Sequence, residues 1–462
     1  MPEIKFSNSL TGKKETFKPV KKSHVGIYSC GPTVYSEQHI GNLRTALLTD
    51  LIIRVLKYNK YKIKHIINYT DVGHLTSDRD EGEDKVERAA KKENLSVKEI
   101  TQKYINLYEK DLEKLNIQFG KRVRATEHIK EQIELIKKLE KKGYTYKTSD
   151  GIYFDTSKFK SYGQLAGFGK IERKAGARIS LGEKKNSSDF ALWKFSQEGE
   201  KRLQEWDSPW GIGFPGWHIE CSAMSMKYLG ETFDIHTGGQ DLSQVHHNNE
   251  IAQSECATGK KFVNYWIHGG FLSIGGEKAS KSTGNIMTIS ELEEQGYSPM
   301  HYRYFALQTH YRKPLNFTLE NLDSAKTAYE RAKRKIIELK SQEHKGNDLT
   351  KEYEAKFIKA INDDLNLPEA LQIFLKVVED FDFEPKSKLK LLEKFDKVLG
   401  LKISEMQESL ILPSPKVENY LKEREKLRQN KLWAEADIIR ERIREEGYEI
   451  EDTEQGPKLS RI

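Results

Sequence analysis

Four side chains that could bind one metal ion lie far apart in this sequence. Cys30 precedes a Gly-Pro turn, Cys221 lies in GWHIECSAMS, and His246 and Glu250 lie in HHNNEIAQSE. On a helix, residues four apart share a face, so His246 and Glu250 could bind the same ion. Two thiolates, an imidazole and a carboxylate together suit zinc, which accepts sulfur, nitrogen and oxygen ligands. The residue types therefore predict a zinc site that the fold assembles from distant segments.

The spacing leaves two alternatives open. His247 could replace His246 as the ligand, because residues three apart, such as His247 and Glu250, also share a helical face. Each cysteine could instead be a small buried hydrophobic residue, and we assign Cys256 to this class. Three cysteines in 462 residues exclude a disulfide framework. In a reducing compartment they favour metal binding or packing.

Another motif suits the binding of a phosphate group. His39-Ile40-Gly41-Asn42 lies where an expected strand ends and an expected helix begins. Gly41 would let a phosphate approach the backbone, and the helix start would offer free N–H groups and a positive dipole end. His39 could donate a hydrogen bond to a phosphate oxygen as negative charge develops. Alone, this tetrapeptide is more often an ordinary loop histidine before a helix start.

Two downstream motifs suit the rest of a nucleotide. Lys278 and Lys281 lie in the small, flexible sequence GEKASKSTGN, from which both could reach a triphosphate and neutralise its departing pyrophosphate. Gly238, Gly239 and Asp241 follow an expected strand in HTGGQD, where a nucleotide could approach closely and a carboxylate could bind its ribose. A lone lysine-serine loop is usually a solvated turn, so these motifs carry weight only together.

The elements that must position these residues follow a strand–helix–strand order. Residues 24–29 and 62–69 are partly apolar and predict two strands. Between them, apolar residues recur on one helical face: Leu43, Leu47, Leu48, Leu51, Ile52 and Val55. This order predicts a parallel pair of strands in an α/β fold. Ligands should then meet the carboxyl ends of the strands, near Cys30, His39 and Thr70.

The rest of the chain predicts further segments around this unit. Residues 96–142 are lysine-rich and are expected to be helical. The expected organisation is a Rossmann-like domain in two halves (1–142 and 210–260) around an inserted segment (143–209), a region with the lysine motif (261–319), a helical bundle (320–400) and a small α+β domain (401–462).

The composition is that of a chain without a membrane segment. No run of about 18 apolar residues occurs, so no segment is expected to span a bilayer. The start, MPEIKFSNSLTGKKETF, lacks the apolar core of a secretory signal, so we expect a cytoplasmic protein. The net charge of +7 is modest, and basic and acidic residues interleave, which is typical of solvated helix faces.

In their order, the motifs resemble those of the class I aminoacyl-tRNA synthetases, and in detail those of the cysteinyl-tRNA synthetase family. HIGN resembles the HIGH signature of that class, and KASKS resembles its KMSKS signature. The stretches that resemble the cysteine-specific family are SCGPTVY, NYTDVGH, GWHIECSAMS, FDIHTGGQDL and HHNNEIAQSE. Asn42 replaces the last histidine of HIGH, but its amide can still donate a hydrogen bond. Ala279 replaces the methionine of KMSKS and leaves both lysines in place.

The resemblance implies a zinc site that selects the substrate. The matching ligands of one zinc ion per subunit would be Cys30, Cys221, His246 and Glu250, which decides between the two histidines. The ion would bind the thiolate of L-cysteine and disfavour serine, a discrimination that a simple apolar pocket makes only weakly. The residues that match family positions in the cysteine pocket or beside the adenylate are Gly31, Thr70, Trp217, His236 and Asp241.

The reaction implied by the resemblance joins L-cysteine to tRNA(Cys). The cysteine carboxylate would attack the α-phosphate of ATP, with Mg²⁺ on the phosphates, and the cysteinyl-adenylate would then acylate the 3′ end of the tRNA. His39, Lys278 and Lys281 would be catalytic, because they would stabilise charge on the phosphates. The residues expected to bind the nucleotide are His39, Asn42, Gly238, Gly239, Asp241 and Lys281.

Contacts with tRNA(Cys) are implied as well. Residues 261–319 would contact the stem and residues 320–400 the body of the tRNA. Residues 401–462 would bind the anticodon, and the side chains that match anticodon-reading positions are Arg428, Asp437 and Asp452. We expect a monomer without a membrane partner.

Two other functions compete with this one. A cysteine ligase of thiol-cofactor biosynthesis would use the same adenylation core but would lack the anticodon module. The tail WAEADIIRERIREEGYEIEDTEQGP argues against that alternative. A non-catalytic RNA-binding protein would be expected to lose the catalytic side chains, whereas His39, Lys278 and Lys281 are all present.

Overall fold

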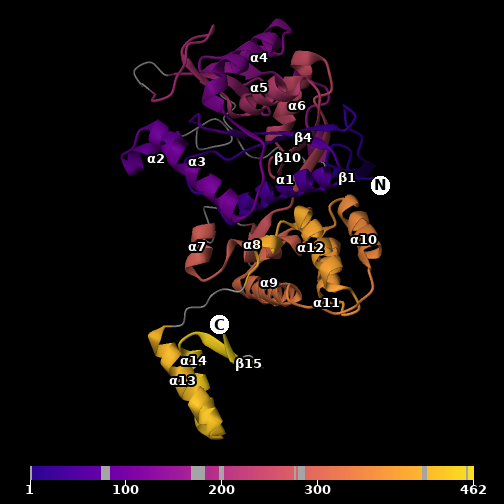
Figure 1. The fold of residues 1–462 in the computed structure, drawn as a ribbon. Helices are drawn as coiled ribbons and strands as arrows, with labels where there is room; N and C mark the ends of the chain where they lie inside the picture. Colours follow the sequence, from indigo (N-terminus) through magenta and orange to yellow (C-terminus); the bar gives the residue numbers. More distant parts are fainter. Residues whose placement is uncertain are drawn as a thin grey trace. The chain divides into compact units, whose positions relative to one another are not determined.

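The chain divides into two compact units, residues 1–404 and residues 405–462. The structure is a computed structural model, and the residues it describes are 3–73, 84–167, 183–196, 202–274, 277–278, 287–407, 414–453 and 456–461. In Figure 1 the first unit contains a sheet with its covering helices, drawn from indigo to rose, and a helical part in orange.

A five-stranded parallel sheet forms the centre of the first unit. Its strand order is β11-β10-β3-β4-β5. The strands are β3 (His24–Ser29), β4 (Lys62–Tyr69), β5 (Lys121–Arg124), β10 (Phe233–Gly239) and β11 (Val263–Gly269). Because all five run in one direction, the carboxyl ends of β3, β4 and β10 lie at the same end of the sheet, where ligands are expected. The parallel pairing of β3 with β4 confirms the prediction from the strand–helix–strand order.

Helix α1 (Ile40–Tyr58) connects β3 to β4, as predicted. It is buried on most sides, because it packs both on the sheet and on helix α12 (Pro385–Leu399). Its N-cap is His39, whose backbone is extended and whose side chain accepts a hydrogen bond from the Asn42 N–H. The helix therefore begins within the motif that was expected to bind phosphate.

One stretch that was expected to be helical contains a strand. The prediction for residues 96–142 is right for α3 (Val97–Lys114) and α4 (Ile129–Lys141) but wrong for β5. This strand lies at the edge of the sheet, and Val123 is its single buried side chain. A short, charged strand has no alternating pattern to detect, so its pairing with β4 is decided by tertiary contacts.

A four-stranded antiparallel sheet precedes helix α5 (Trp217–Leu229). Its strands are β6 (Thr145–Lys147), β7 (Gly151–Phe154), β8 (Phe190–Phe195) and β9 (Gly213–Pro215). Phe154 and Trp193 are buried in the core on which α5 packs. The Gly216 N–H donates to the carbonyl of Leu192 (2.9 Å), so β8 fixes the point at which α5 begins.

Helices dominate the remainder of the first unit, which confirms the helical prediction for residues 320–400. The bundle consists of α9 (Leu319–Leu339), α10 (Thr350–Asn362), α11 (Leu367–Glu379) and α12. Between sheet and bundle lie β12 (Leu272–Ile274), β13 (Glu277–Lys278), α7 (Ile289–Glu294), α8 (Pro299–Leu307) and β14 (Leu315–Phe317). The other elements are β1 (Lys5–Asn8), β2 (Lys13–Thr16), α2 (Lys85–Glu93) and α6 (His246–Thr258). Within the described part of the chain, no helix has the length and apolarity needed to cross a membrane.

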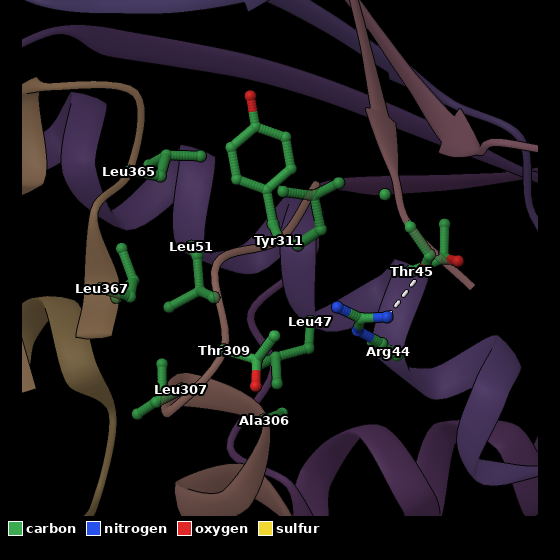
Figure 2. A pocket seen from close by; sticks show the side chains of 13 residues that line it. Arg44, Thr45, Leu47, Leu51, Ala306, Leu307, Thr309, Tyr311, Leu365 and Leu367 are labelled. Atoms are coloured by element: carbon green, nitrogen blue, oxygen red, sulfur yellow. Dashed lines mark hydrogen bonds between the residues drawn. The ribbon is translucent and has the colours of Figure 1, made fainter. Parts of the chain in front are cut away.

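A buried ion cluster joins α1 to the bundle. Asp50 on α1 accepts hydrogen bonds from Arg54 Nε (2.8 Å) and from Arg303 Nη2 on α8 (2.8 Å). Arg54 also donates to the Lys397 carbonyl (3.2 Å) and Arg303 to the Leu399 carbonyl (2.7 Å), both on α12. Buried charges are tolerated only when each is paired and hydrogen-bonded, so this junction resists displacement. Figure 2 shows a small cavity nearby, lined mainly by leucine side chains of α1, α8 and the start of α11.

The second unit is an α+β domain, as expected for the C-terminal segment. It contains α13 (Pro415–Gln429), α14 (Trp433–Glu445) and the antiparallel hairpin of β15 (Tyr448–Thr453) and β16 (Gly456–Arg461). Its buried apolar core consists of Val417, Ile439, Ile443, Tyr448 and Ile450.

Candidate metal centre and nucleotide pocket

A pocket at the carboxyl ends of the central strands brings the two predicted groups of residues together. Its lining includes Cys30 and Gly31 as well as Asn42, Gly239 and Asp241. The first pair belongs to the expected metal and cysteine site, and the other three belong to the expected nucleotide site. The parallel sheet thus brings residues of both expected sites to one pocket, at the position that the strand order predicts.

The four side chains predicted to be metal ligands lie next to one another. One ligand atom from each of Cys30, Cys221, His246 and Glu250 lies within 4.8 Å of all the others. The Sγ atoms of Cys30 and Cys221 are 3.7 Å apart, and Glu250 Oε1 lies 3.6 Å from Cys30 Sγ and 3.2 Å from His246 Nε2. Cys30 follows β3, Cys221 lies on α5, and the other two lie on α6, so three elements assemble the group.

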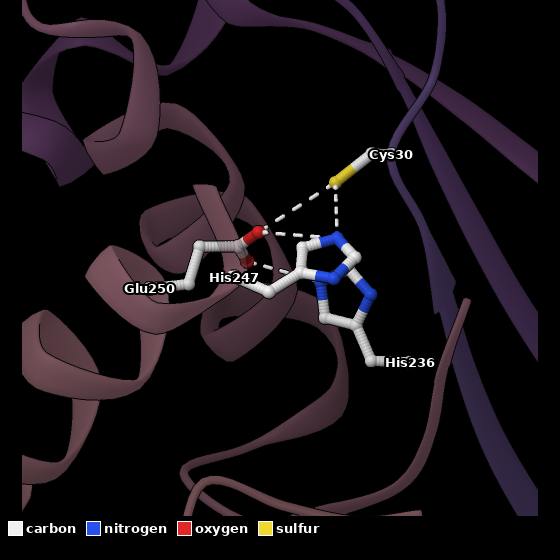
Figure 3. A group of neighbouring side chains, drawn as sticks. All are labelled: Cys30, His236, His247 and Glu250. Carbon is white, nitrogen blue, oxygen red and sulfur yellow. Dashed lines mark hydrogen bonds and ion pairs between the residues drawn. The ribbon is translucent and has the colours of Figure 1, made fainter. Parts of the chain in front are cut away.

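A second group of possible ligands overlaps the first. It consists of Cys30, His236, His247 and Glu250, which Figure 3 shows facing one another. His247 Nε2 lies 3.5 Å from Cys30 Sγ and 3.9 Å from Glu250 Oε1, and His236 Nε2 lies 3.0 Å from Glu250 Oε2. His236 was expected beside the adenylate, whereas its imidazole borders the metal cluster. The distances alone leave both groups possible.

Hydrogen bonding favours the group that contains His246. Its Nδ1 lies 2.8 Å from His218 Nδ1, and its buried Nε2 lies 3.2 Å from Glu250 Oε1 without hydrogen-bond geometry. A cation between the Nε2 and Oε1 atoms would bind both of them. In the other group, His236 Nε2 would have to give up its contact with Glu250. The donors of the first group are two sulfurs, a nitrogen and an oxygen, which fit zinc.

Without a cation the cluster retains protons. Burial raises the pKa of the Cys30 thiol well above its ordinary value, and Cys221 and Glu250 raise it further. The hydrogen bond from Cys30 lowers the pKa of Cys221. Burial opposes protonation of His246, but Cys221 and Glu250 raise its pKa to about 10. Burial would raise the pKa of Glu250, but His236 and His246 lower it to about 2. A divalent cation would displace the protons on Cys30 and His246.

Asn68, which was not identified from the sequence, orders the wall of the pocket. Its Oδ1 accepts a hydrogen bond from the Gly31 N–H (2.9 Å), and its Nδ2 donates to Thr70 Oγ1 (3.0 Å). Thr70 in turn donates to Glu220 Oε2 (3.0 Å). A Cβ atom at position 31 would lie 1.7 Å from the Asn68 carbonyl oxygen, so only glycine fits there. The sequence signal that could have identified Asn68 was its place near the end of the expected strand, in the segment NYT.

Trp217 lies at the start of α5, on the metal side of the site. Its ring centroid is 5.0 Å from that of His246, and the Nζ of Lys85 is 5.8 Å from the ring. This places the predicted pocket residue against a predicted metal ligand.

The helix start fixes the hydrogen positions of the phosphate motif. His39 Nδ1 accepts a hydrogen bond from the Asn42 N–H (3.2 Å), so the proton of a neutral His39 is on Nε2. The Asn42 side chain donates to Gln38 Oε1 (2.5 Å), and Gln38 Nε2 donates to the Ser36 carbonyl (3.0 Å). This chain of bonds fixes the orientation of both amides. Gln38, a buried residue beside the motif, was missed by the sequence analysis.

The remaining predicted nucleotide residues are placed as follows. Gly238 and Gly239 end β10, and a Cβ atom at Gly239 would lie 2.4 Å from Asp241 Oδ1. The backbone of Lys278 lies in β13, where it pairs with Ser273. Lys281 and Ala279 lie outside the described residues.

In the second unit, two of the three predicted anticodon residues meet. Asp452 accepts hydrogen bonds from Arg428 Nη1 (2.9 Å) and, through both carboxylate oxygens, from Arg424 (2.8 Å each). Asp437 is exposed on α14. Arg424 is buried and was not identified from the sequence, because its partner lies on a distant strand.

One comparison with known structures bears on the fold. The structure of Mycobacterium tuberculosis methionyl-tRNA synthetase bound by methionyl-adenylate has a TM-score of 0.58, with 82% of this chain and 92% of that chain covered. At 13% sequence identity this similarity shows the fold alone. It agrees with the class I synthetase fold indicated by the motifs.

Sequence comparisons are more specific. Residues 16–327 match the family model described as the tRNA synthetases class I (C) catalytic domain. The chain is 46% identical over 445 residues to "Cysteine--tRNA ligase 1" of Burkholderia lata, covering 96% of this chain and 94% of that protein. It is 40% identical over 484 residues to "Cysteine--tRNA ligase" of Treponema denticola, covering 97% and 98%. The chain therefore belongs to the cysteinyl-tRNA synthetase family of class I aminoacyl-tRNA synthetases.

Proposed function

We propose that this protein is a cysteine–tRNA ligase, which activates L-cysteine with ATP and transfers it to the 3′ end of tRNA(Cys). The observation that carries the proposal is the cluster of two thiols, an imidazole and a carboxylate that borders the pocket lined by Asn42, Gly239 and Asp241. Relatives named as cysteine–tRNA ligases match nearly the whole chain, including its C-terminal segment. That coverage disfavours a thiol-cofactor ligase without an anticodon module.

Selection of cysteine would depend on one zinc ion held by Cys30, Cys221, His246 and Glu250. When bound, zinc would supply a thiophilic Lewis acid for the substrate thiolate, which the hydroxyl of serine matches poorly. Around it, Asn68 holds Gly31 and Thr70, so the backbone at Gly31 forms a fixed wall for a small substrate. Trp217 would close the pocket on the opposite side. Such a site needs no editing domain to reject serine.

Adenylate formation would depend on positioning and electrostatics. His39 would donate its Nε2–H to a phosphate oxygen as the cysteine carboxylate attacks the α-phosphate, because its Nδ1 is held by the Asn42 N–H. Lys278 and Lys281 would stabilise the departing Mg²⁺-bound pyrophosphate. Asn42, Gly238 and Gly239 would allow the nucleotide to approach the backbone closely, and Asp241 would bind its ribose. His236 would lie at the boundary between the nucleotide site and the cysteine site. These groups bind and orient the substrates, and none forms a covalent intermediate.

For tRNA, we assign the stem contact to residues 261–319, the body contact to residues 320–400 and the anticodon contact to residues 401–462. Arg428, Asp437 and Asp452 would read the anticodon, since arginine can bond guanine and a carboxylate can accept from an exocyclic amine. The boundaries of residues 1–142, 143–209 and 210–260 as segments of the catalytic domain, the monomeric state and the cytoplasmic location remain predictions from the sequence.

The decisive experiment combines metal analysis with substrate selection on one preparation. Purified protein should contain zinc and should catalyse pyrophosphate exchange with L-cysteine but not with L-serine, and it should charge purified tRNA(Cys). Cys221→Ser should lose zinc and cysteine activation, whereas the matched control Cys256→Ser, a buried thiol outside the cluster, should keep both.

Two results would contradict the proposal. Unchanged zinc content in Cys221→Ser would remove this cysteine from the metal site. Cysteine-dependent exchange without any charging of tRNA would favour the thiol-cofactor ligase instead.

A further inference from the structure

Arg44 is a buried arginine just after the phosphate motif on α1, and its partners are backbone carbonyls. Its Nη1 donates to the carbonyls of Gly270 (2.8 Å) and Phe271 (2.6 Å), and its Nη2 donates to the carbonyl of Lys313 (2.6 Å). The residue is only 7% exposed. A guanidinium is the side chain that can serve several carbonyls at once, because its donors lie in a planar fork.

These carbonyls belong to the segments that lead into the β12–β13 hairpin and its neighbour. Gly270 and Phe271 connect β11 to β12, and Lys313 precedes β14. β12 pairs with β13 through Ser273 and Lys278, and with β14 through Leu272 and Leu315. Arg44 therefore bonds to the two connections that lead into the small sheet β13-β12-β14. The backbone of Lys278 lies in its edge strand β13.

The surroundings make the carbonyls of Gly270 and Lys313 depend most on Arg44. Figure 2 shows Arg44 at one end of the cavity lined by Leu47, Leu51, Leu307 and Leu367. A cavity with mainly apolar walls offers few partners to a water molecule, so water is a poor substitute for the lost donors. Removing the guanidinium would take one donor from each of the three carbonyls. That of Phe271 would keep its bond from the Leu315 N–H (2.9 Å), and the connection would move to satisfy those of Gly270 and Lys313.

A second tie links the same helix start to residues that follow the lysine motif. The Ile40 N–H donates to the Met287 carbonyl (2.9 Å), and His39 and Thr288 form a β-bridge. The Ile40 carbonyl accepts a hydrogen bond from the Tyr302 hydroxyl (2.6 Å) on α8. The first two turns of α1 are thus bonded to the chain on both sides of residues 279–286.

We propose that Arg44 and Tyr302 are positioning residues for adenylate formation, holding the β12–β13 hairpin and Met287 in register with His39. The proposal rests on the proposed function, in which His39 and Lys278 act on the phosphates of ATP. Arg44 need not touch the substrate. Its contribution is geometric, because misplacing a catalytic group by about 1 Å can reduce a rate by about a hundredfold.

The test compares two buried arginines on the same helix. In Arg44→Lys the charge remains, but one ammonium group does not span the three carbonyls. The turnover number of cysteine-dependent pyrophosphate exchange should fall by about tenfold to a hundredfold, with the KM for cysteine and the zinc content unchanged. The matched control is Arg54→Lys, because Arg54 donates to Asp50 and to the Lys397 carbonyl, away from the hairpin. It should lower the unfolding temperature while leaving the exchange rate near that of the wild type.

The outcomes separate the inference from the proposed function. If the wild type shows no cysteine-dependent exchange, the proposed function fails. If the wild type is active and Arg44→Lys loses no more activity than Arg54→Lys, the positioning role of Arg44 is overturned.

A milder variant keeps the test decisive if Arg44→Lys does not fold. Tyr302→Phe removes one hydroxyl and should reduce the exchange turnover by about fivefold, the value of one hydrogen bond. Its control is Tyr329→Phe, whose hydroxyl donates to the Leu401 carbonyl in the bundle (3.3 Å). Equal turnover in both tyrosine variants would overturn the inference.

Discussion

His65 should make the stability of the first unit depend on pH. This histidine lies on β4 and is 4% exposed. Its Nδ1 accepts a hydrogen bond from the Gly120 N–H (3.0 Å), so the neutral ring carries its proton on Nε2 and donates to Ser29 Oγ (2.9 Å). Ser29 precedes Cys30, so the bond supports the strand end that presents the predicted metal ligand. Burial, aided by the positive charges of Arg122 and Lys57, lowers the pKa of His65 to about 3.

The sign and size of the effect follow from the two pKa values of His65. The unfolded chain binds a proton below a pKa of about 6.5, whereas the folded protein stays neutral at this site until about pH 3. The stabilisation is therefore complete above pH 6.5 or so and is lost as the pH falls toward 3. Between about pH 7.5 and about pH 5 the loss from this single group is about 2 kcal/mol.

The assay is urea unfolding followed by tryptophan fluorescence at both pH values, for the wild type and for His65→Gln. Glutamine does not titrate, and every other group is common to the two proteins, so the difference between them isolates His65. The wild type should lose about 2 kcal/mol more than the variant on acidification. An equal loss in both proteins, or a larger one in the variant, would refute the assignment of a neutral buried imidazole.

The affinity of the metal-depleted protein for zinc should increase as the pH rises, because Cys30 and His246 must release protons when they bind the ion. The pKa of Cys30 is raised well above its ordinary value, and that of His246 is raised to about 10. The apparent affinity, measured against a chromophoric chelator, should increase at least about tenfold per pH unit near neutrality. Gln38→Leu should raise the KM for ATP in pyrophosphate exchange about fivefold, because the Asn42 amide loses the bond that orients it. Asp50→Asn should destabilise the first unit by about 3 to 5 kcal/mol in thermal unfolding, because two buried guanidinium groups lose their counter-charge.

Each of these expectations has a result that would count against it. A zinc affinity independent of pH would mean that the cluster holds no displaceable protons. A raised KM for cysteine with an unchanged KM for ATP would move Gln38 from the nucleotide side to the amino-acid side. An Asp50→Asn protein as stable as the wild type would mean that water reaches the ion cluster.

The elements that the sequence predicted are those with a strong local pattern. The apolar repeat of α1 and the two neighbouring strands specified a parallel pair, and the ordered motifs identified the family. The grouping of Cys30, Cys221, His246 and Glu250 was expected through that resemblance. Spacing alone left His246 and His247 equivalent, and the distances also admit a group with His247.

What the sequence did not predict depends on contacts between distant segments. β5 has one buried side chain, so its pairing with β4 leaves almost no trace in the local pattern. Arg44, Asn68 and Arg424 bond to backbone atoms or side chains far along the chain. The residues next to them in the sequence do not indicate those partners. Gln38 acts on an adjacent motif, yet its orientation depends on a backbone carbonyl whose direction only the fold determines.

The attachment of α1 at Asp50 has a mechanical consequence. From Asp50 to His39 the helix extends about 16 Å, at 1.5 Å per residue. If the bundle rotated α1 about that anchor by only about 4°, the imidazole of His39 would swing by about 1 Å. A displacement of the bundle would thus reach His39 along α1, without any change in the central sheet.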